Sequence, residues 1–134
     1  MTQTITKLNP LDDGSATIEV THVKKEYKDG KFFDGKKTRV AFVIVDENKS
    51  LNEKLEYAYR WTQNIHDSWS MDGEMDGNVN VIRTAPLHEK DGKVFGLRST
   101  SVGDFMSLGN VKYVVSEIGF KKLYSFKYGT WNRI

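Results

Sequence analysis

The chain has 134 residues with a formal net charge of +2, and 38% of them are hydrophobic. This length suits one domain, and the composition excludes a chain that is disordered throughout. Cysteine is absent, which excludes disulfides and thiolate chemistry. No apolar run approaches the roughly 20 residues of a membrane-spanning helix, and the N-terminus has no signal-peptide pattern. We therefore expect one cytoplasmic domain over residues 1–134, with residues 1–13 as a loose arm and no membrane partner.

Two strands are predicted first. Residues 15–23 alternate apolar and polar side chains, as a half-buried strand does. Residues 38–47 are β-branched and nearly continuously apolar, which is typical of a strand covered on both faces. Between them, Asp29–Gly30 and Asp34–Gly35 are both turn signals. We expect an antiparallel hairpin with a long basic tip.

One helix is predicted next, over about residues 51–64. Ser50 is a suitable N-cap, and Glu53 three residues later completes a capping box. Side chains at helical spacing form one stripe that should be buried against the sheet: Leu51, Leu55, Ala58, Thr62 and Ile65.

The C-terminal half predicts further short strands. Residues 78–84 alternate as a strand does, and Asp91–Gly92 indicates another turn. Three more strands are predicted over residues 104–108, 111–118 and 121–126, the first two joined at Gly109–Asn110. The expected fold is α+β, a mostly antiparallel sheet of about six strands with one main amphipathic helix on one face.

Residues 24–39 hold seven basic residues against three acidic ones. Lysines interleaved with aromatic rings are typical of surfaces that contact phosphates and stack on unpaired bases. The segment therefore predicts a nucleic-acid interface at the hairpin tip, and its candidate residues are Lys24, Lys25, Lys28, Lys31, Phe32, Phe33, Lys36, Lys37 and Arg39.

Residues 66–78 form an acidic loop with a single tryptophan. An exposed Trp69 beside flexible Met71 is typical of the anchor of a protein interface. The alternative is that Trp69 folds back onto the end of the helix. The acidic candidates for partner binding are Asp72, Glu74 and Asp76. These three resemble the start of a calcium-binding EF-hand, but position 12 of such a loop is Arg83, so no metal is expected.

No catalytic signature is legible. The three histidines, His22, His66 and His88, lack the spacing of a zinc site. Neither Ser99 nor Ser101 lies in a nucleophile elbow, and no nucleotide-binding glycine loop occurs. We therefore expect a protein that is not an enzyme and has no cofactor.

The segment Arg98–Asp104, "RSTSVGD", has two interpretations. Its hydroxyl side chains and Gly103 favour a turn before a strand, with Asp104 capping that turn. Alternatively, Arg98, Ser99 and Thr100 contact a partner.

The same segment also resembles a known family. "RSTSVGD" followed by "YVVSEIGFKKL" resembles the pattern of YodL-like modules, and the similar region covers about residues 51–123. Such modules occur in phage and mobile-element proteins. The resemblance implies a virus or mobile element that acts inside a bacterium. We expect a small accessory protein, monomeric or homodimeric, in the host's cytoplasm. The expected function is to bind and modulate a host macromolecule, chiefly a protein, as a host-takeover or anti-defence inhibitor, with nucleic-acid binding through residues 24–39 as the alternative.

Overall fold

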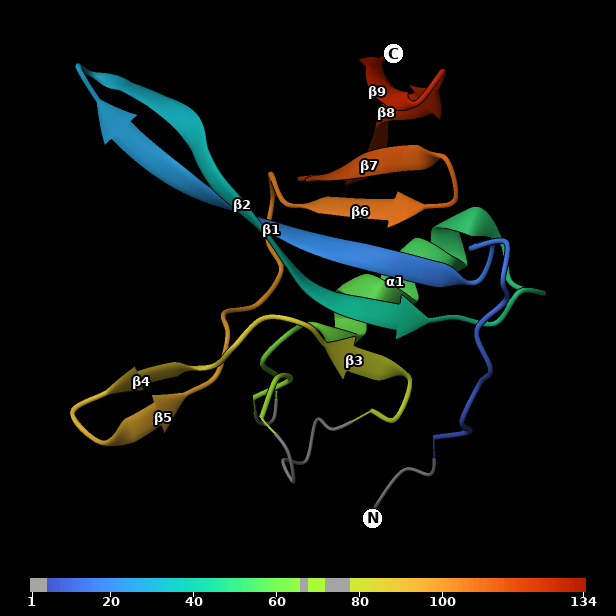
Figure 1. The fold of residues 1–134 in the computed structure, drawn as a ribbon, viewed down its shortest axis with the longest axis horizontal. Helices are drawn as coiled ribbons and strands as arrows, with labels where there is room; N and C mark the ends of the chain where they lie inside the picture. The colour runs from blue at the N-terminus through green and yellow to red at the C-terminus, as the bar shows by residue number, and fades with distance from the viewer. Residues whose placement is uncertain (1–4, 66–67, 72–77) are drawn as a thin grey trace.

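The computed structural model describes residues 5–65, 68–71 and 78–134. Seven strands form one antiparallel sheet in the order β3-β2-β1-β6-β7-β8-β9, and two more form a separate hairpin, β4–β5 (Figure 1). The elements in chain order are β1 (Thr17–Lys28), β2 (Lys31–Ile44), α1 (Leu51–Trp61), β3 (Val81–Arg83), β4 (His88–Lys90), β5 (Lys93–Phe95), β6 (Phe105–Leu108), β7 (Val111–Ser116), β8 (Gly119–Lys127) and β9 (Thr130–Arg133). A mostly antiparallel sheet with one helix is as predicted, with seven strands in the main sheet instead of about six.

Strands β1 and β2 form the predicted hairpin, which projects from the body of the molecule (Figure 1). The turn is Asp29–Gly30, where both residues have positive φ, 53° and 78°. That geometry suits a two-residue hairpin turn. The second predicted turn, Asp34–Gly35, is wrong, because both residues continue β2. Two residues of β2 oppose one of β1 there, so the extra residue is absorbed as a bulge.

Helix α1 begins with the predicted capping box of Ser50 and Glu53 but ends at Trp61 instead of Asn64. The Thr62 hydroxyl donates to the carbonyl of Ala58 at 2.8 Å, and the chain leaves the helix there. Leu55 and Ala58 are buried as expected.

The two ends of the predicted helical stripe are exposed, which corrects that expectation. Leu51 is 44% exposed and Ile65 is 54% exposed. Leu51 lies in the first turn, at the rim of the packed face, and Ile65 lies beyond the helix end.

The turns of the remaining hairpins lie at turn-forming residue pairs. Asp91–Gly92 joins β4 to β5 and Gly109–Asn110 joins β6 to β7, as predicted. The sequence analysis missed β9, which pairs with β8 through a turn at Tyr128–Gly129. Both turn residues have positive φ, 54° and 78°. All four residues of β9 are exposed, so the strand has no buried side chain to reveal it.

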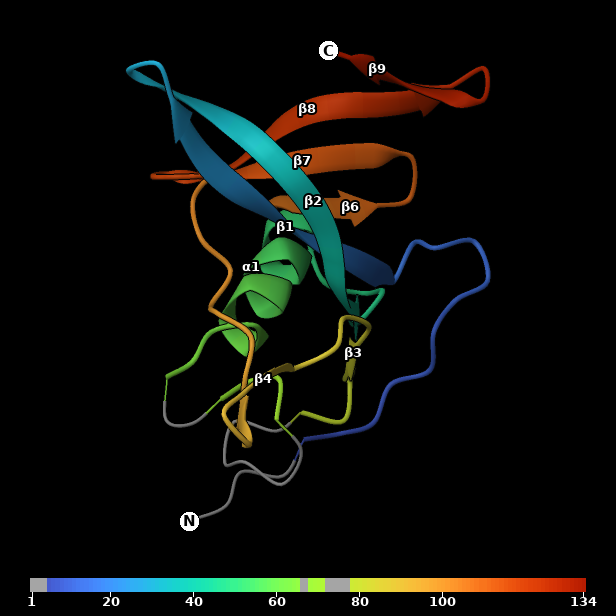
Figure 2. The same cartoon turned by 60° about the vertical axis from the view of Figure 1, so that its left-hand side comes forward.

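Helix α1 covers one face of the sheet. In Figure 2 the helix lies to one side of β1 and β2, and in Figure 1 it lies behind them. The core between these layers includes Ile18, Val20, Val43, Leu55, Ala58 and Met106. The opposite face of the sheet, toward the viewer in Figure 1, is not covered by the helix. We call it the open face.

The N-terminal arm has no helix or strand over residues 5–13, yet it is tethered, not loose. The Leu8 amide donates to Asn80 Oδ1 at 2.7 Å, and Asn80 Nδ2 donates to the carbonyl of Thr6 at 2.8 Å. Asn80 is buried, so this tether is part of the packed structure. No helix in the described ranges is both long and apolar enough to cross a membrane.

Candidate functional site

The segment Arg98–Asp104 folds into a compact polar knot, which we call the clasp. Arg98 forms a two-pronged ion pair with Asp104, with Nη1–Oδ2 at 2.6 Å and Nη2–Oδ1 at 2.8 Å. The same carboxylate accepts from the amides of Val23 and Ser101, both at 2.8 Å. Arg98 also donates to the carbonyl of Val23. The clasp therefore joins β1 to the segment that leads into β6.

The predicted turn inside the clasp is confirmed. Gly103 has φ of 94°, and the Asp104 amide donates to the carbonyl of Ser101 at 3.0 Å. Burial disfavours the charge on Asp104, but hydrogen bonds from Arg98 and from the two amides outweigh burial and hold the pKa of Asp104 below 3.8. The hydrogen bond to Asp104 also raises the pKa of Arg98. Both groups are charged at neutral pH, and each is neutralised by the other.

A chain of buried hydroxyl groups continues from the clasp to α1. Thr62 donates to Ala58, and Thr100 Oγ1 donates to Thr62 Oγ1 at 2.8 Å. Because the Thr100 proton is used in this way, Thr100 accepts the 2.9 Å hydrogen bond from His22 Nε2. Burial lowers the pKa of His22 from 6.5 to about 4, so the imidazole is neutral at pH 7.

This hydroxyl–imidazole pair is not arranged for nucleophilic catalysis. Thr100 is buried and its proton points to Thr62, not to His22. Asp104 Oδ2 lies 4.0 Å from Nε2, the same ring nitrogen that contacts Thr100, so Asp104 does not orient the opposite nitrogen as the carboxylate of a triad does. Ser99 Oγ accepts from the Asn64 amide at 2.8 Å. The hydroxyls and His22 therefore hold the helix end against the clasp.

Trp69 is buried, so the expectation of an exposed interface anchor is wrong. Only 5% of the residue is exposed. The indole Nε1 donates to the carbonyl of Arg98 at 2.8 Å, and the Trp69 amide donates to Asn64 Oδ1 at 2.9 Å. The alternative interpretation, in which the ring folds back toward the end of the helix, is the one that the structure supports.

The other partner-binding candidates divide into three groups. Met71 is half-buried. Asp72, Glu74 and Asp76 lie outside the described residues. Arg98, Ser99 and Thr100 have their polar groups engaged inside the chain, although the Arg98 side chain is partly exposed. In the described ranges, no cluster of three or more His, Asp or Glu side chains is placed to hold a metal ion.

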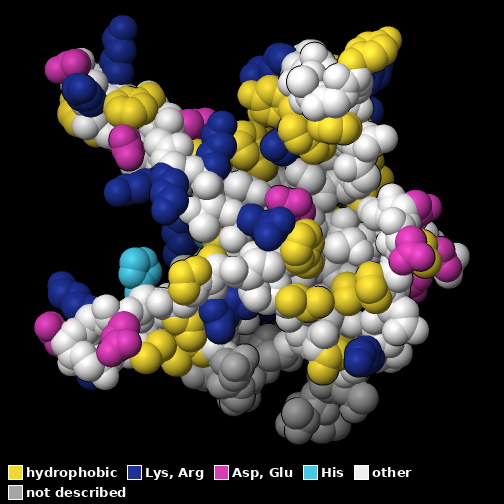
Figure 3. Space-filling view, in the orientation of Figure 1, with side chains coloured by type: hydrophobic (Ala, Val, Ile, Leu, Met, Phe, Trp, Pro, Cys, Tyr) yellow, Lys and Arg dark blue, Asp and Glu magenta, His cyan; other side chains and the backbone are white. Residues whose placement is uncertain are grey.

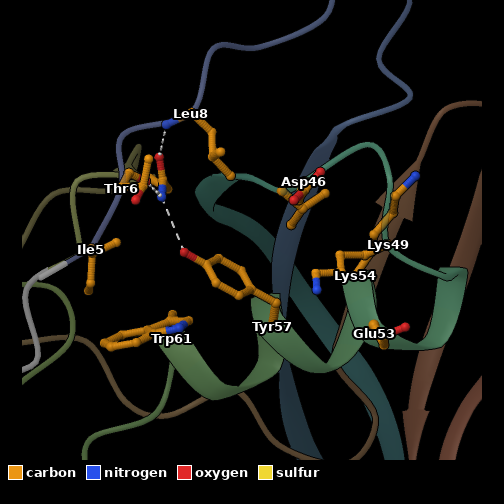
Figure 4. A pocket seen from close by; sticks show the side chains of 11 residues that line it. Ile5, Thr6, Leu8, Asp46, Lys49, Glu53, Lys54, Tyr57 and Trp61 are labelled. Carbon is orange, nitrogen blue, oxygen red and sulfur yellow. Dashed lines mark hydrogen bonds between the residues drawn. The ribbon is translucent and has the colours of Figure 1, made fainter. Parts of the chain in front are cut away.

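A pocket of about 410 Å³ lies between α1 and the N-terminal arm (Figure 4). Tyr57 and Trp61 form its helix side, and Ile5, Thr6 and Leu8 lie across from them (Figure 4). The Tyr57 hydroxyl accepts from Asn80 Nδ2 at 3.2 Å, so the helix is bonded to the same asparagine that holds the N-terminal arm. The charged residues at the rim are balanced, with Lys49 and Lys54 against Asp46 and Glu53.

The basic segment 24–39 forms the projecting part of the β1–β2 hairpin, which we call the arm. Its nine predicted residues do not share one face. Lys24 and Lys36 line a pocket on the side of the arm that continues the helix-covered face. Lys28 and Lys31 pair beside the turn. Lys25 forms an ion pair with Asp34, and Phe33 pairs with Glu26 across the strands.

The opposite side of the arm is continuous with the open face of the sheet. Directly paired residues share a face in an antiparallel ladder. On this side the pairs are Glu19–Phe42, Thr21–Arg39, Val23–Lys37, Lys25–Asp34 and Tyr27–Phe32. We call this row the outer ladder. It leads from the centre of the sheet to two aromatic rings at the tip, whose centres lie 4.9 Å apart. Phe32 is 76% exposed and Tyr27 is 65% exposed.

The open face carries cations that lie over aromatic rings. Arg39 lies 4.7 Å from the centre of the Phe42 ring, and Lys112 lies 4.6 Å from that of Trp131. Lys112 and Arg133 both lie 5.9 Å from the centre of the Tyr124 ring. Figure 3 views the molecule from this side and shows Lys and Arg side chains along the arm and beside apolar groups on the body.

The sheet is curled, so the open face is concave. Phe42 on β2 and Trp131 on β9 line one groove of about 300 Å³. In a flat sheet these strands would lie five spacings, about 24 Å, apart. Acidic residues line this groove at the end away from the arm: Asp12, Asp13 and Glu19. Arg39 and Lys37 lie toward the arm. Lys112 lies level with Glu19 and over Trp131, so it partly offsets the acidic charge of the groove.

Comparisons of the chain with protein-family models, curated proteins and solved structures give no significant match.

The sequence analysis missed the β6–β9 part of the open face. Its functional candidates, Lys112, Tyr124, Phe126, Trp131 and Arg133, come from three strands, and register brings them together. One signal was present in the sequence, because Tyr124 and Phe126, and then Trp131 and Arg133, alternate with polar residues. Alternation of that kind places side chains on one side of a strand. Because the sequence analysis did not predict β9, it could not place these residues beside one another on paired strands.

Proposed function

We propose that the protein is a non-catalytic binding module for single-stranded nucleic acid, bound along the outer ladder and the adjoining basic part of the open face. The single observation that carries the proposal is the register of β1 and β2. That register aligns Arg39, Lys37 and the Tyr27–Phe32 rings on the same side as the open face.

Stacking is the first physical support. A planar base stacks on an aromatic ring whatever its sequence, provided that the base is unpaired. Phe32 and Tyr27 are large apolar side chains exposed at a projecting tip, where no contact within the chain requires them. Exposed apolar groups rimmed by polar ones mark binding surfaces.

Charge is the second support. Lys37, Arg39, Lys112 and Arg133 project over the same face as the rings. A cation over a ring at an exposed site gains only about 0.5–1 kcal/mol, so the exposed Lys37, Arg39 and Arg133 can turn toward phosphates. Asp12, Asp13 and Glu19 repel phosphates at one end of the groove, and Lys112 over Trp131 marks the limit to which the bound strand extends.

The expected role of an accessory protein that binds a host protein stays a prediction. Its expected anchor, Trp69, is buried, and Arg98 and Thr100 are bonded within the chain. The outer ladder, in contrast, combines exposed rings with unburied cations. Nucleic-acid binding is also compatible with an accessory role in a phage or mobile element.

Fluorescence anisotropy with a labelled 20-nucleotide single strand and the matching duplex tests the proposal. We expect tighter binding to the single strand, with an affinity that falls as salt rises because counterions are released. Absence of binding to either form at low salt would refute nucleic-acid binding. Equal affinity for both forms would refute the stacking part of the proposal and leave only charge.

A further inference from the structure

A second pocket lies on the inner side of the arm, on the opposite face from the outer ladder. It has a volume of about 470 Å³ and is bounded by the arm, by the clasp and by the small β4–β5 hairpin. Figure 3 shows the gap between the two projecting hairpins, with basic side chains on the side of the arm. The lining residues are His22, Lys24, Lys36, Thr38, Val40, Ala85, His88, Gly96, Leu97 and Arg98.

The charged groups of this pocket are all cationic. Lys24, Lys36 and Arg98 line it, and no Asp or Glu does so among the described residues. The charge of Arg98 is balanced by Asp104 behind it, so the remaining positive charge of the lining comes from the two lysines. The Glu26 carboxylate lies beside Gly35, outside the pocket lining. Neither lysine forms an ion pair with a described carboxylate, whereas Lys25, one residue along the same strand, is paired with Asp34.

The backbone brings the two lysines together. The ladder pairs Val23 with Lys37 and Lys25 with Asp34, so Lys24 alone faces the two residues Gly35 and Lys36. This is a β-bulge, a feature that redirects a side chain and is common beside functional sites. Here the bulge places Lys36 on the pocket side, across from Lys24. Like charges that face each other across two strands are destabilising unless an anion lies between them.

We propose that this pocket binds a phosphate group, held between the ammonium groups of Lys24 and Lys36 with the Thr38 hydroxyl and the rim of the clasp beside it. Two ammonium groups without an ion pair to a described carboxylate suit a phosphate dianion, and lysine is a common phosphate ligand. The pocket is of a size that takes a small molecule. The phosphate belongs either to a free phosphate ester or to the 5′ end of a nucleic acid. This site is separate from the outer ladder and does not depend on the proposed function.

Backbone amide NMR shifts during titration with inorganic phosphate, at constant ionic strength maintained with chloride, test the site. We expect saturable shifts at Lys24, Lys36, His88 and Leu97. The Lys24→Gln/Lys36→Gln double variant should bind phosphate at least tenfold more weakly. Both lysines are exposed, so the variant should fold, and its amide spectrum reports that directly. The matched control is Lys121→Gln/Lys122→Gln, which removes the same charge from β8 and should bind as the original chain does.

Two further titrations identify the source of the phosphate. Adenosine monophosphate is compared with a short oligonucleotide that carries a 5′-phosphate or a 5′-hydroxyl group. Pocket shifts with the mononucleotide assign the site to free phosphate esters, and pocket shifts only with the 5′-phosphorylated oligonucleotide assign it to nucleic-acid ends. The proposal is overturned if phosphate shifts are unsaturable, are spread over all basic surfaces, or persist unchanged in the Lys24→Gln/Lys36→Gln variant.

Discussion

The clasp and the outer ladder use similar side chains for opposite purposes. In the clasp, Arg98 meets a buried carboxylate, and both of its terminal nitrogens donate to groups of the same chain. On the outer ladder, Arg39 lies over a ring and Phe32 is largely exposed. A polar group that is satisfied internally stabilises the fold, and one that is left at the surface can serve a ligand.

The comparison also explains why a distinctive sequence motif need not be a binding site. "RSTSVGD" contains an arginine, three hydroxyl side chains and an aspartate, a set that would suit recognition of a partner. In the folded chain the same groups join β1, the end of α1 and the start of β6. Their distinctive spacing follows from the geometry of the clasp, because Arg98 and Asp104 bond β1 while two of the hydroxyls between them bond the end of α1.

The largest effect should come from breaking the clasp. Asp104→Ala should lower the free energy of unfolding by about 3–5 kcal/mol, because Arg98 and two amides lose a buried acceptor. Urea denaturation measures this change. The control is Asp34→Ala, which breaks the exposed pair with Lys25 and should cost at most about 1 kcal/mol. Equal losses in the two variants would contradict a structural role for the clasp.

The second prediction concerns acid. His22 has a pKa of about 4 in the folded chain against 6.5 for an unperturbed histidine, so the unfolded chain binds the extra proton between these pH values. The contribution of His22 to stability is complete above pH 6.5 and is lost as the pH falls toward 4. We expect a loss of about 1–3 kcal/mol over that interval. Asp104 contributes mainly at lower pH, because its pKa in the folded chain is lowered from 3.8 by its hydrogen bonds.

Urea denaturation at pH 7.0, 6.0, 5.0 and 4.5 checks this dependence. His22→Gln keeps an N–H group that can donate to Thr100 but cannot titrate, so its stability should change less with pH than that of the original chain. If the free energy of unfolding falls with pH in the same way for the two proteins, His22 is not the titrating group.

The third prediction tests the ladder at its tip. Phe32→Ala should weaken binding of single-stranded nucleic acid by about 1–3 kcal/mol, roughly 5- to 150-fold, if a base stacks on the ring. Stability should be unchanged because the ring is exposed. Tyr128→Ala removes a fully exposed aromatic from the β8–β9 turn and is the matched control. Anisotropy titrations measure both variants, and an equal loss in the two would contradict a specific role for the tip.

The smallest effect concerns individual cations on the open face. Arg39→Gln and Lys112→Gln should each reduce the slope of log affinity against log salt by about 0.7, the value for one phosphate contact with a single strand. Lys49→Gln removes the same charge beside α1, on the other side of the sheet, and should leave the slope unchanged. Unchanged slopes for Arg39→Gln and Lys112→Gln would place the phosphates elsewhere.

The sequence predicted those parts of the fold whose signals are local. The Ser50–Glu53 capping box, the Asp29–Gly30 turn and the Gly109–Asn110 turn each depend on a few adjacent residues, and all three are confirmed. The exposure of Leu51 and Ile65 was not predictable from helical spacing, because burial at a helix end depends on what packs there.

The candidate site was predictable only in part for the same physical reason. Local composition identified the basic and aromatic residues of the arm. Their division between two faces depends on the bulge at Gly35–Lys36, and the contribution of β6–β9 depends on pairing between distant strands. The burial of Trp69 depends on a contact with the carbonyl of Arg98, 29 residues away.

The three tryptophan indole N–H signals test the central claim most directly. Trp131 lies on the open face under Lys112, Trp69 is bonded to the clasp, and Trp61 lines the pocket beside α1. In a two-dimensional ¹H–¹⁵N NMR titration with a single-stranded oligonucleotide, the Trp131 signal should shift while the Trp69 and Trp61 signals stay in place. A shift of the Trp61 signal with Trp131 unmoved would contradict the proposal that the open face and its outer ladder bind nucleic acid.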